Sequence, residues 1–374
     1  MTQLLPKLTN ANDFLPTRIN TGNFVSYYSL PELIQRVEHT RVVLPLCSLG
    51  TPASELTQLG ELVLPPLYYE AMEMAVDLKP AILARIEQCF PYFGSDRRQS
   101  TSKCQIKVVE LPRRKALRDP QSSMVQVRAA DQFIVAFSVD TAVEQHGPHL
   151  PLATDTIQSY AVLNRLTHEF PELVLLPPVD YGQLTWGLPF GMSVDISAAL
   201  LVRYVTGFVN AVHQWLRPAA IFVVDVHGSI IHRTAIQDGL AASSCPHWSF
   251  RWLYDPLVPY SGQRGDQHAG GVETAIVEAI HPALVDASWW PSLLGELADK
   301  QMPVSDAISL SANLQEFRAQ VERQQLNGIV GNIHNYAHVN GVEMLNSMVN
   351  VARADLLQLR QRLSSTHRDL DAVN

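Results

Sequence analysis

The most regular feature of the sequence is an alternation of short apolar runs with longer amphipathic segments in its second part. The apolar runs lie at 133–137, 173–176, 220–224 and 248–254, and the amphipathic segments at 157–170, 197–216 and 271–280. The runs have the length and β-branched content of strands, and the amphipathic segments have the period of helices. Strands that are apolar on both faces and alternate with helices indicate a largely parallel sheet covered on both sides.

The first part of the chain carries a similar but shorter pattern. Residues 41–46 and 106–111 read as strands, and 69–89 has helical periodicity, with a second helix starting at Pro80. The run Leu-Val-Leu-Pro-Pro at 62–66 resembles Leu-Val-Leu-Leu-Pro-Pro at 173–178. We therefore expect an N-terminal α/β extension over 1–128, either a degenerate half-repeat or a chance likeness, followed by the main domain over 129–374.

Composition limits the classes of function. The 374 residues include 28 Lys+Arg and 36 Asp+Glu, which gives a net charge of −8 and argues against a nucleic-acid binder. The four cysteines form no CxxC pair and read as thiols of a reducing compartment. No signal peptide is apparent, and the apolar runs are too short to span a membrane. We expect a soluble, cytoplasmic protein that binds neither nucleic acid nor membrane.

Polar clusters follow the predicted strands. The loop after 133–137 carries Glu144, His146, His149 and Asp155 within twelve positions. Carboxylate and imidazole groups together are ligands for zinc or manganese. Taken alone, such a pair of side chains is also common as a satisfied surface pair.

Two further clusters occupy comparable places. His227 follows the strand at 220–224, and His268 and Glu273 lie at the start of the helix at 271–280. Read singly, His227 is also compatible with a core histidine, and Glu273 with a carboxylate favoured by the helix dipole. Because parallel sheets place their sites at the carboxyl ends of strands, the clusters are expected to meet. Carboxylates gathered there without Lys or Arg partners repel one another unless a cation is present.

Two motifs resemble those of the creatininase (creatinine amidohydrolase) family. They are Glu-Gln-His-Gly-Pro-His-Leu-Pro at 144–151, with Thr154 and Asp155, and His-Ala-Gly-Gly-Val-Glu-Thr at 268–274. The resemblance covers roughly residues 130 to 350. It implies a three-layer α/β/α sandwich, a binuclear metal centre that hydrolyses C–N bonds, and assembly into a homo-oligomer.

The resemblance also implies roles for individual residues. The metal ligands would be Glu144, His146, Asp155, His227 and Glu273, with Asp155 bridging two divalent ions. His268 would be the proton shuttle, and His149 would orient a ligand. We expect Zn²⁺ first, with Mn²⁺ or Fe²⁺ as alternatives.

Departures from the family pattern affect the expected substrate. Some members carry a carboxylate where this chain has Ser229, which leaves open whether Glu273 or another carboxylate completes the site. Arg264 stands where creatinine-cleaving members have a stacking tryptophan, and an arginine suits a carboxylate-bearing substrate better than creatinine. Trp186 and Trp252 are candidates to line the substrate pocket, although tryptophans are also common in cores and interfaces.

Together these features predict a metal-dependent amidohydrolase. In this hypothesis a metal-bridging hydroxide attacks a small or cyclic amide other than creatinine, and His268 protonates the leaving nitrogen. One alternative is a peptidase that trims a small peptide precursor. Another is a non-catalytic binding or scaffold protein that has kept the fold.

Overall fold

A computed structural model describes residues 42–47, 62–73, 77–89, 106–110, 133–184, 186–262, 265–266 and 268–371. The main sheet has the order β6 (Leu173–Leu175), β5 (Ile134–Ser138), β7 (Ala220–Asp225) and β8 (Trp248–Trp252). All three strand pairings are parallel. The parallel sheet predicted from the apolar runs is confirmed.

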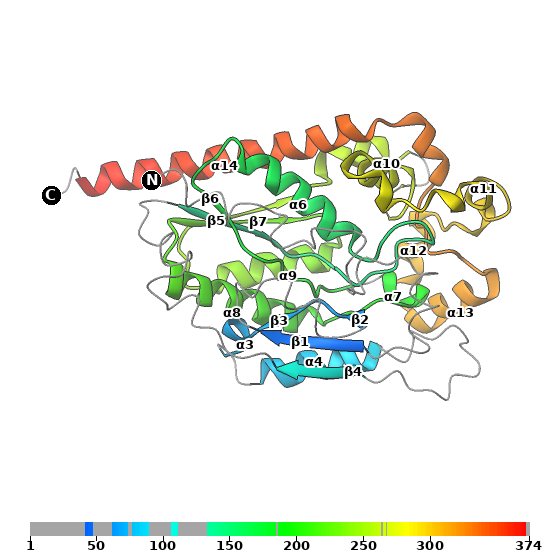
Figure 1. Cartoon of the computed structure of the whole chain (residues 1–374), viewed down its shortest axis with the longest axis horizontal. Coiled ribbons are helices and arrows are strands. Elements are labelled where there is room, and N and C mark those ends of the chain that lie inside the picture. Colours follow the sequence, from blue (N-terminus) through cyan, green and yellow to red (C-terminus); the bar gives the residue numbers. More distant parts are fainter. Residues whose placement is uncertain are drawn as a thin grey trace.

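Helices cover both faces of this sheet (Figure 1). Alternate residues of each strand divide between two cores, so Ile134 and Phe222 face one side and Val135 and Ile221 face the other. The first core includes α6 (Thr154–Thr167), α10 (Gly271–Ile280) and α14 (Gly341–Asp371). The second includes α8 (Ala198–Leu216) and α9 (Ile230–Ala241). The result is the three-layer α/β/α sandwich expected from the family resemblance.

Smaller helices complete the described chain. They are α3 (Tyr69–Glu73), α4 (Leu78–Cys89), α7 (Gly187–Phe190), α11 (Trp290–Leu294), α12 (Val304–Leu310) and α13 (Leu314–Gln324). Helix α4 starts two residues before the expected Pro80, which its first turn accommodates because the earliest helical N–H groups have no intrahelical partner. Across the described ranges, no helix is both long and apolar enough to cross a membrane.

A second parallel sheet belongs to the N-terminal part. Its central strand β1 (Val42–Cys47) pairs on one side with β4 (Ile106–Glu110) and on the other with β2 (Leu62–Val63) and β3 (Leu67–Tyr68). The two prolines between β2 and β3 interrupt the ladder.

Both sheets contain the same interruption. Val42 pairs with Leu62 and Leu46 with Leu67, so one extra residue lies on the proline-containing side. In the main sheet, Ile134 pairs with Leu173, and Val139 pairs with Val179. The proline-containing side therefore again has one extra residue. This likeness is compatible with a half-repeat; the repeat itself and the division at residues 128 and 129 stay predictions.

Helix α8 lies between the two sheets. The Phe208 ring centroid is 4.8 Å from that of Phe137 on β5 and 6.1 Å from that of Tyr68 on β3. Residues of both sheets belong to one continuous hydrophobic core around this helix. The described N-terminal elements are therefore packed onto the main domain, below α8 in Figure 1.

Candidate metal centre

The loop that follows β5 supplies two of the predicted ligands from a fixed backbone. All residues from 139 to 153 are buried. The Ala142 N–H donates to the Asp180 carbonyl at 2.9 Å, and the Glu144 N–H donates to the Leu152 carbonyl at 3.3 Å. Gly147 turns the chain with φ of +68°, a conformation that favours glycine. The loop therefore presents Glu144 and His146 rigidly at the carboxyl edge of the sheet.

Three other segments bring the remaining predicted residues to the same edge. Asp155 lies in the first turn of α6, because this helix begins at Thr154 rather than at the expected 157. His227 follows the end of β7, and Glu273 lies in the first turn of α10. The residues predicted from three separate sequence clusters are thus brought together.

The donor atoms form two groups that share Asp155. The first group is Glu144, Asp155 and His227, and the second is His146, Asp155 and Glu273; within each, the donor atoms lie within 4.8 Å of one another. Nδ1 of His227 is 2.9 Å from Oε2 of Glu144 and 3.4 Å from Oδ2 of Asp155. The other Asp155 oxygen, Oδ1, is 3.3 Å from Nε2 of His146. The two oxygens of Asp155 thus face different groups.

Each of the two histidines uses one ring nitrogen to fix its orientation. Nδ1 of His146 is 3.0 Å from the Glu144 carbonyl, and Nε2 of His227 is 3.0 Å from the Gln183 carbonyl. A carbonyl only accepts hydrogen bonds, so these nitrogens carry the hydrogens. The opposite nitrogens are directed at the carboxylates, as in histidines that bind metals.

The electrostatics of this cluster call for positive charge. Burial alone would lower the pKa of His146, but the carboxylates of Glu273 and Asp155 raise it to about 10. Burial likewise opposes charge on His227, while Glu144 and Asp155 raise its pKa well above the usual value. The buried Nε2 of His146 makes no hydrogen bond. Divalent cations between these nitrogens and carboxylates would satisfy both, so the donor set fits a metal centre.

Outer contacts hold the carboxylates. The hydroxyl of Thr141 lies 2.7 Å from Oδ2 of Asp155 and also contacts Glu144. Oε1 of Glu273 accepts a hydrogen bond of 2.9 Å from Gln158, and its Oε2 accepts one of 2.6 Å from the Ala269 N–H. Such contacts orient the ligands of a metal site.

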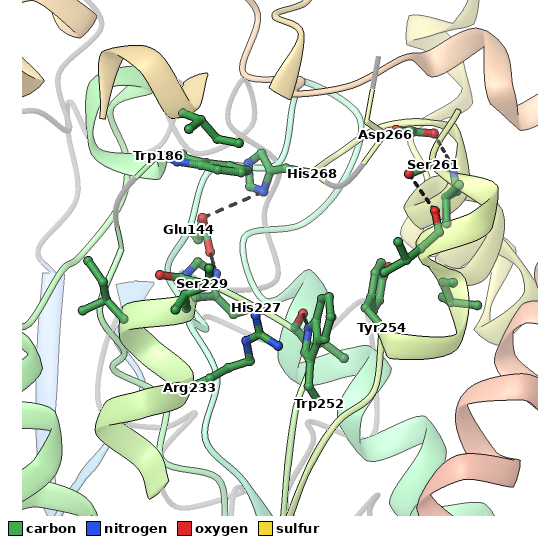
Figure 2. Close-up of a pocket in the computed structure, with 18 of the residues that line it drawn as sticks. Glu144, Trp186, His227, Ser229, Arg233, Trp252, Tyr254, Ser261, Asp266 and His268 are labelled. Atoms are coloured by element: carbon green, nitrogen blue, oxygen red, sulfur yellow. Dashed lines mark hydrogen bonds and ion pairs between the residues drawn. The ribbon is translucent and has the colours of Figure 1, made fainter. Parts of the chain in front are cut away.

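His268 lies beside the two groups. Its Nε2–H donates to the Gln145 carbonyl at 2.7 Å, while its Nδ1 is 3.8 Å from Oε1 of Glu144 (Figure 2). Burial and the neighbouring His146 lower the pKa of His268 to about 4. Its Nδ1 is therefore unprotonated near neutral pH. The same nitrogen also lies in a third possible metal-binding group, with Glu144 and His146.

A cavity of about 600 Å³ opens next to these residues. Glu144, His227 and His268 line it, together with Trp186 and Trp252, the two tryptophans predicted for the substrate pocket. In the view of Figure 2, Trp186 lies at the end near His268, and Trp252 lies beyond His227. Mainly apolar pockets with a few polar groups are typical of binding sites for small ligands.

Comparison with known proteins agrees with the motifs. Residues 121–355 match the family described as "Creatininase: Creatinine amidohydrolase". The chain belongs to the creatininase family. Its two signature segments, 144–151 and 268–274, both lie inside the matched region.

Curated relatives within this family include peptidases. The chain is similar to the mycofactocin precursor peptide peptidase of Mycolicibacterium smegmatis, with 32% identity over 149 residues, 38% of this chain and 56% of the relative. The enzyme of the same name from Mycobacterium ulcerans is 30% identical over 154 residues, 38% of this chain and 57% of the relative. The chain thus spans little more than half the length of these relatives.

Solved structures of creatininases also align with the chain. A crystal structure of creatinine amidohydrolase aligns with a TM-score of 0.46 and 20% identity, over 63% of this chain and 93% of that chain. A structure described as "Creatininase Mn" aligns with a TM-score of 0.45 and 15% identity, over 63% of this chain and 94% of that chain.

Arg264 and His149 of this creatininase-family chain were also expected to belong to the site. Arg264 lies outside the described residues, so its predicted role stays a prediction. Within the described part of the chain, His149 forms no hydrogen bond or ion pair with a predicted ligand. Its Nε2 is 2.8 Å from the hydroxyl of Thr274, the neighbour of Glu273. An orienting role for His149 would therefore act through the first turn of α10.

Sequence reasoning did not single out several residues of this site. Thr141 lies within the first cluster, but a hydroxyl without a motif gave no signal. Gln158 could have been found, because it follows Asp155 by three positions and so lies on the same face of α6. Tyr254, whose hydroxyl is 2.7 Å from Oε1 of Gln158, is brought in only by the tertiary fold.

Proposed function

We propose that this chain is a metal-dependent hydrolase that cleaves a C–N amide bond of a short peptide. The observation that carries the proposal is the arrangement of two donor groups that share Asp155 beside a cavity. Membership of the creatininase family and the similarity to peptide peptidases support it.

In this proposal, Glu144, Asp155 and His227 hold one divalent ion, and His146, Asp155 and Glu273 hold a second. Imidazole and carboxylate ligands suit Zn²⁺ first, with Mn²⁺ or Fe²⁺ as alternatives. Such ions, when bound, supply polarisation of the scissile carbonyl and a water of lowered pKa.

His268 handles the proton. Its Nε2–H is tied to the Gln145 carbonyl, so the ring can exchange a proton only at Nδ1. Burial favours a neutral ring at the start of the reaction, and Nδ1 is the position that accepts the proton that the attacking water loses. It then donates this proton to the departing amide nitrogen.

The rim of the cavity favours a peptide over a small cyclic amide. Ile230 and Ile308 line the cavity and are 73% and 56% exposed, so the mouth offers apolar surface to a longer substrate. A small cyclic amide would need only the part of the cavity next to Glu144 and His268. It remains the second candidate, and a non-catalytic scaffold is the third.

The test is a panel of peptides and cyclic amides assayed with Zn²⁺- or Mn²⁺-loaded protein. Glu144→Gln and His268→Ala are each expected to abolish hydrolysis, while the matched variant His213→Ala on α8, remote from this edge of the sheet, keeps it. Full activity in Glu144→Gln or His268→Ala would contradict the assigned role. Hydrolysis of cyclic amides alone would favour the second candidate, and no hydrolysis by the loaded protein would favour the scaffold.

Assembly and location are also part of the proposal. We expect a homo-oligomer in the cytoplasm, in which the N-terminal extension covers the family's contact surface or takes the place of a neighbouring subunit. Light scattering on the purified full chain tests the first point, because a monomeric mass would contradict it.

A further inference from the structure

Arg233 places a cation in the cavity wall. It extends from the first turn of α9, and its guanidinium carbon lies 4.1 Å from the centre of the Trp252 ring. Its Nε is buried and makes no hydrogen bond to any residue that the structure describes. Among the residues that the structure describes, no carboxylate forms an ion pair with Arg233, whereas Arg251 pairs with two carboxylates and Arg353 with one.

The platform beneath this arginine is fixed. The Trp252 indole N–H lies 3.3 Å from the Val226 carbonyl. Gly228 packs so closely on the ring that a Cβ there would lie 2.5 Å from Nε1 of Trp252. A guanidinium stacked on a fixed aromatic ring keeps its N–H groups available at the ring's edge and loses little freedom when it binds a ligand. Arg233 is thus pre-organised for an anion.

The position of Arg233 separates it from the proton-transfer end of the cavity. In Figure 2 His268 lies on one side of Glu144, and Arg233 lies on the other, towards Trp252. A substrate that reaches both would place its amide near the donor groups and its anionic group farther along the cavity. A guanidinium binds a carboxylate through two parallel N–H···O bonds.

Apolar side chains also line this cavity. Ile230, Ile231, Val258 and Ile308 line it, and their exposed fractions are 73%, 51%, 47% and 56%. Large exposed aliphatic side chains that line a cavity are typical of a binding surface. A ligand that fits this cavity therefore carries apolar side chains together with a negative charge.

We propose that Arg233 is a specificity-determining residue that binds a carboxylate of an apolar peptide substrate. The inference rests on the proposed peptide hydrolysis and names the class of substrate for that site. Two sources offer the same chemistry, the C-terminal carboxylate of the peptide and an acidic side chain within it.

The test measures binding of defined peptides to the Zn²⁺-loaded full chain by calorimetry, under conditions in which cleavage is monitored separately. The first pair of probes is acetyl-Val-Leu-Phe as the free acid and as the C-terminal amide. The second pair is acetyl-Val-Leu-Glu-Phe amide and its Gln counterpart. We expect the acid of at least one pair to bind about 10-fold tighter, and the pair that shows this identifies the source.

Arg233→Gln is expected to reduce that ratio to about 1 and to leave the affinity of the neutral probe unchanged. The matched variant Arg323→Gln, at an exposed position of helix α13, is expected to keep the wild-type ratio. The inference is overturned if neither acid binds better than its neutral partner, or if Arg233→Gln keeps the preference. If the acid probe binds better than its neutral partner but no peptide is cleaved, only the proposed function is contradicted. If peptides are cleaved but the acid probe binds no better than its neutral partner, only this inference is contradicted.

Discussion

The hydroxyl of Tyr181 donates a hydrogen bond of 2.7 Å to the carbonyl oxygen of Pro65. Tyr181 is 1% exposed and follows the interrupted edge of the main sheet, while Pro65 lies in the interruption of the N-terminal sheet. The bond therefore joins the equivalent breaks of the two sheets. It also satisfies a buried carbonyl that the proline break leaves without a ladder partner.

Tyr181→Phe is expected to lower the free energy of unfolding by about 1 kcal/mol, because the Pro65 carbonyl then stays buried without a donor. Denaturant unfolding monitored by circular dichroism measures this. Tyr260→Phe, at a position that is 50% exposed, is the control and should change stability by less than about 0.5 kcal/mol. Equal stability of the two variants would show that the hydrogen bond between Tyr181 and Pro65 does not stabilise the packing of the two sheets.

Phe208 gives a second test of the shared core. Phe208→Ala is expected to cost about 3–5 kcal/mol, because the ring fills the space between β5 and β3. Gln214→Ala, on the exposed side of the same helix, should cost less than about 0.5 kcal/mol. A cost below about 1 kcal/mol for Phe208→Ala would mean that the two sheets do not depend on α8 for their packing.

Gln158 tests the outer contacts of the centre. Gln158→Ala removes the amide that donates to Glu273 and is expected to weaken Zn²⁺ binding by about 10-fold or more. Competition with a chromogenic chelator measures the affinity. Arg165→Gln, farther along α6 and paired with Asn346, should bind Zn²⁺ as the wild type does. An unchanged Zn²⁺ affinity in Gln158→Ala would contradict the claim that Gln158 orients Glu273 as a metal ligand.

The pair of Glu169 and Arg353 predicts a pH effect on stability. Arg353 donates to both oxygens of Glu169, which ties α14 to the segment after α6 and lowers the pKa of that carboxyl. A carboxyl whose pKa is lower in the folded state adds stability above its unfolded pKa, and this contribution is lost as the pH falls through the folded value.

The stability advantage of the wild type over Glu169→Gln should therefore shrink as the pH is lowered from about 5 to about 3. Both groups are largely exposed, so the difference is expected to be small. Thermal unfolding of the two proteins across this pH range measures it. An advantage that stays constant with pH would contradict the ion pair.

Much of the fold was readable from the sequence because the strands of the main sheet are buried on both faces. The runs at 133–137 and 220–224 are apolar throughout, so neither run can form a surface segment. Strands β5 and β7 lie at the expected positions. The start of α6 was placed three residues late, because Thr154 and Asp155 are polar and carry no helical periodicity. Both residues are buried, and Asp155 belongs to the two donor groups, so their surroundings are set by the tertiary fold.

The candidate ligands were readable for a different reason. Glu144, His146 and His268 occur in compact motifs, whereas Arg233 and Tyr254 reach the site through tertiary packing alone. Arg233 follows His227 by six positions without any motif, and only the position of Trp252 on β8 shows that its guanidinium belongs to the cavity wall. Sequence patterns thus indicated the metal chemistry, while specificity required the structure.

The most direct test of the account is the metal content of the purified chain and its variants, measured by elemental analysis after loading with Zn²⁺ or Mn²⁺. We predict two ions per chain in the wild type, about one in His227→Ala and close to none in Asp155→Asn, because Asp155 belongs to both donor groups. Less than one ion per wild-type chain with no gain on metal addition would contradict the account, as would a full complement in Asp155→Asn.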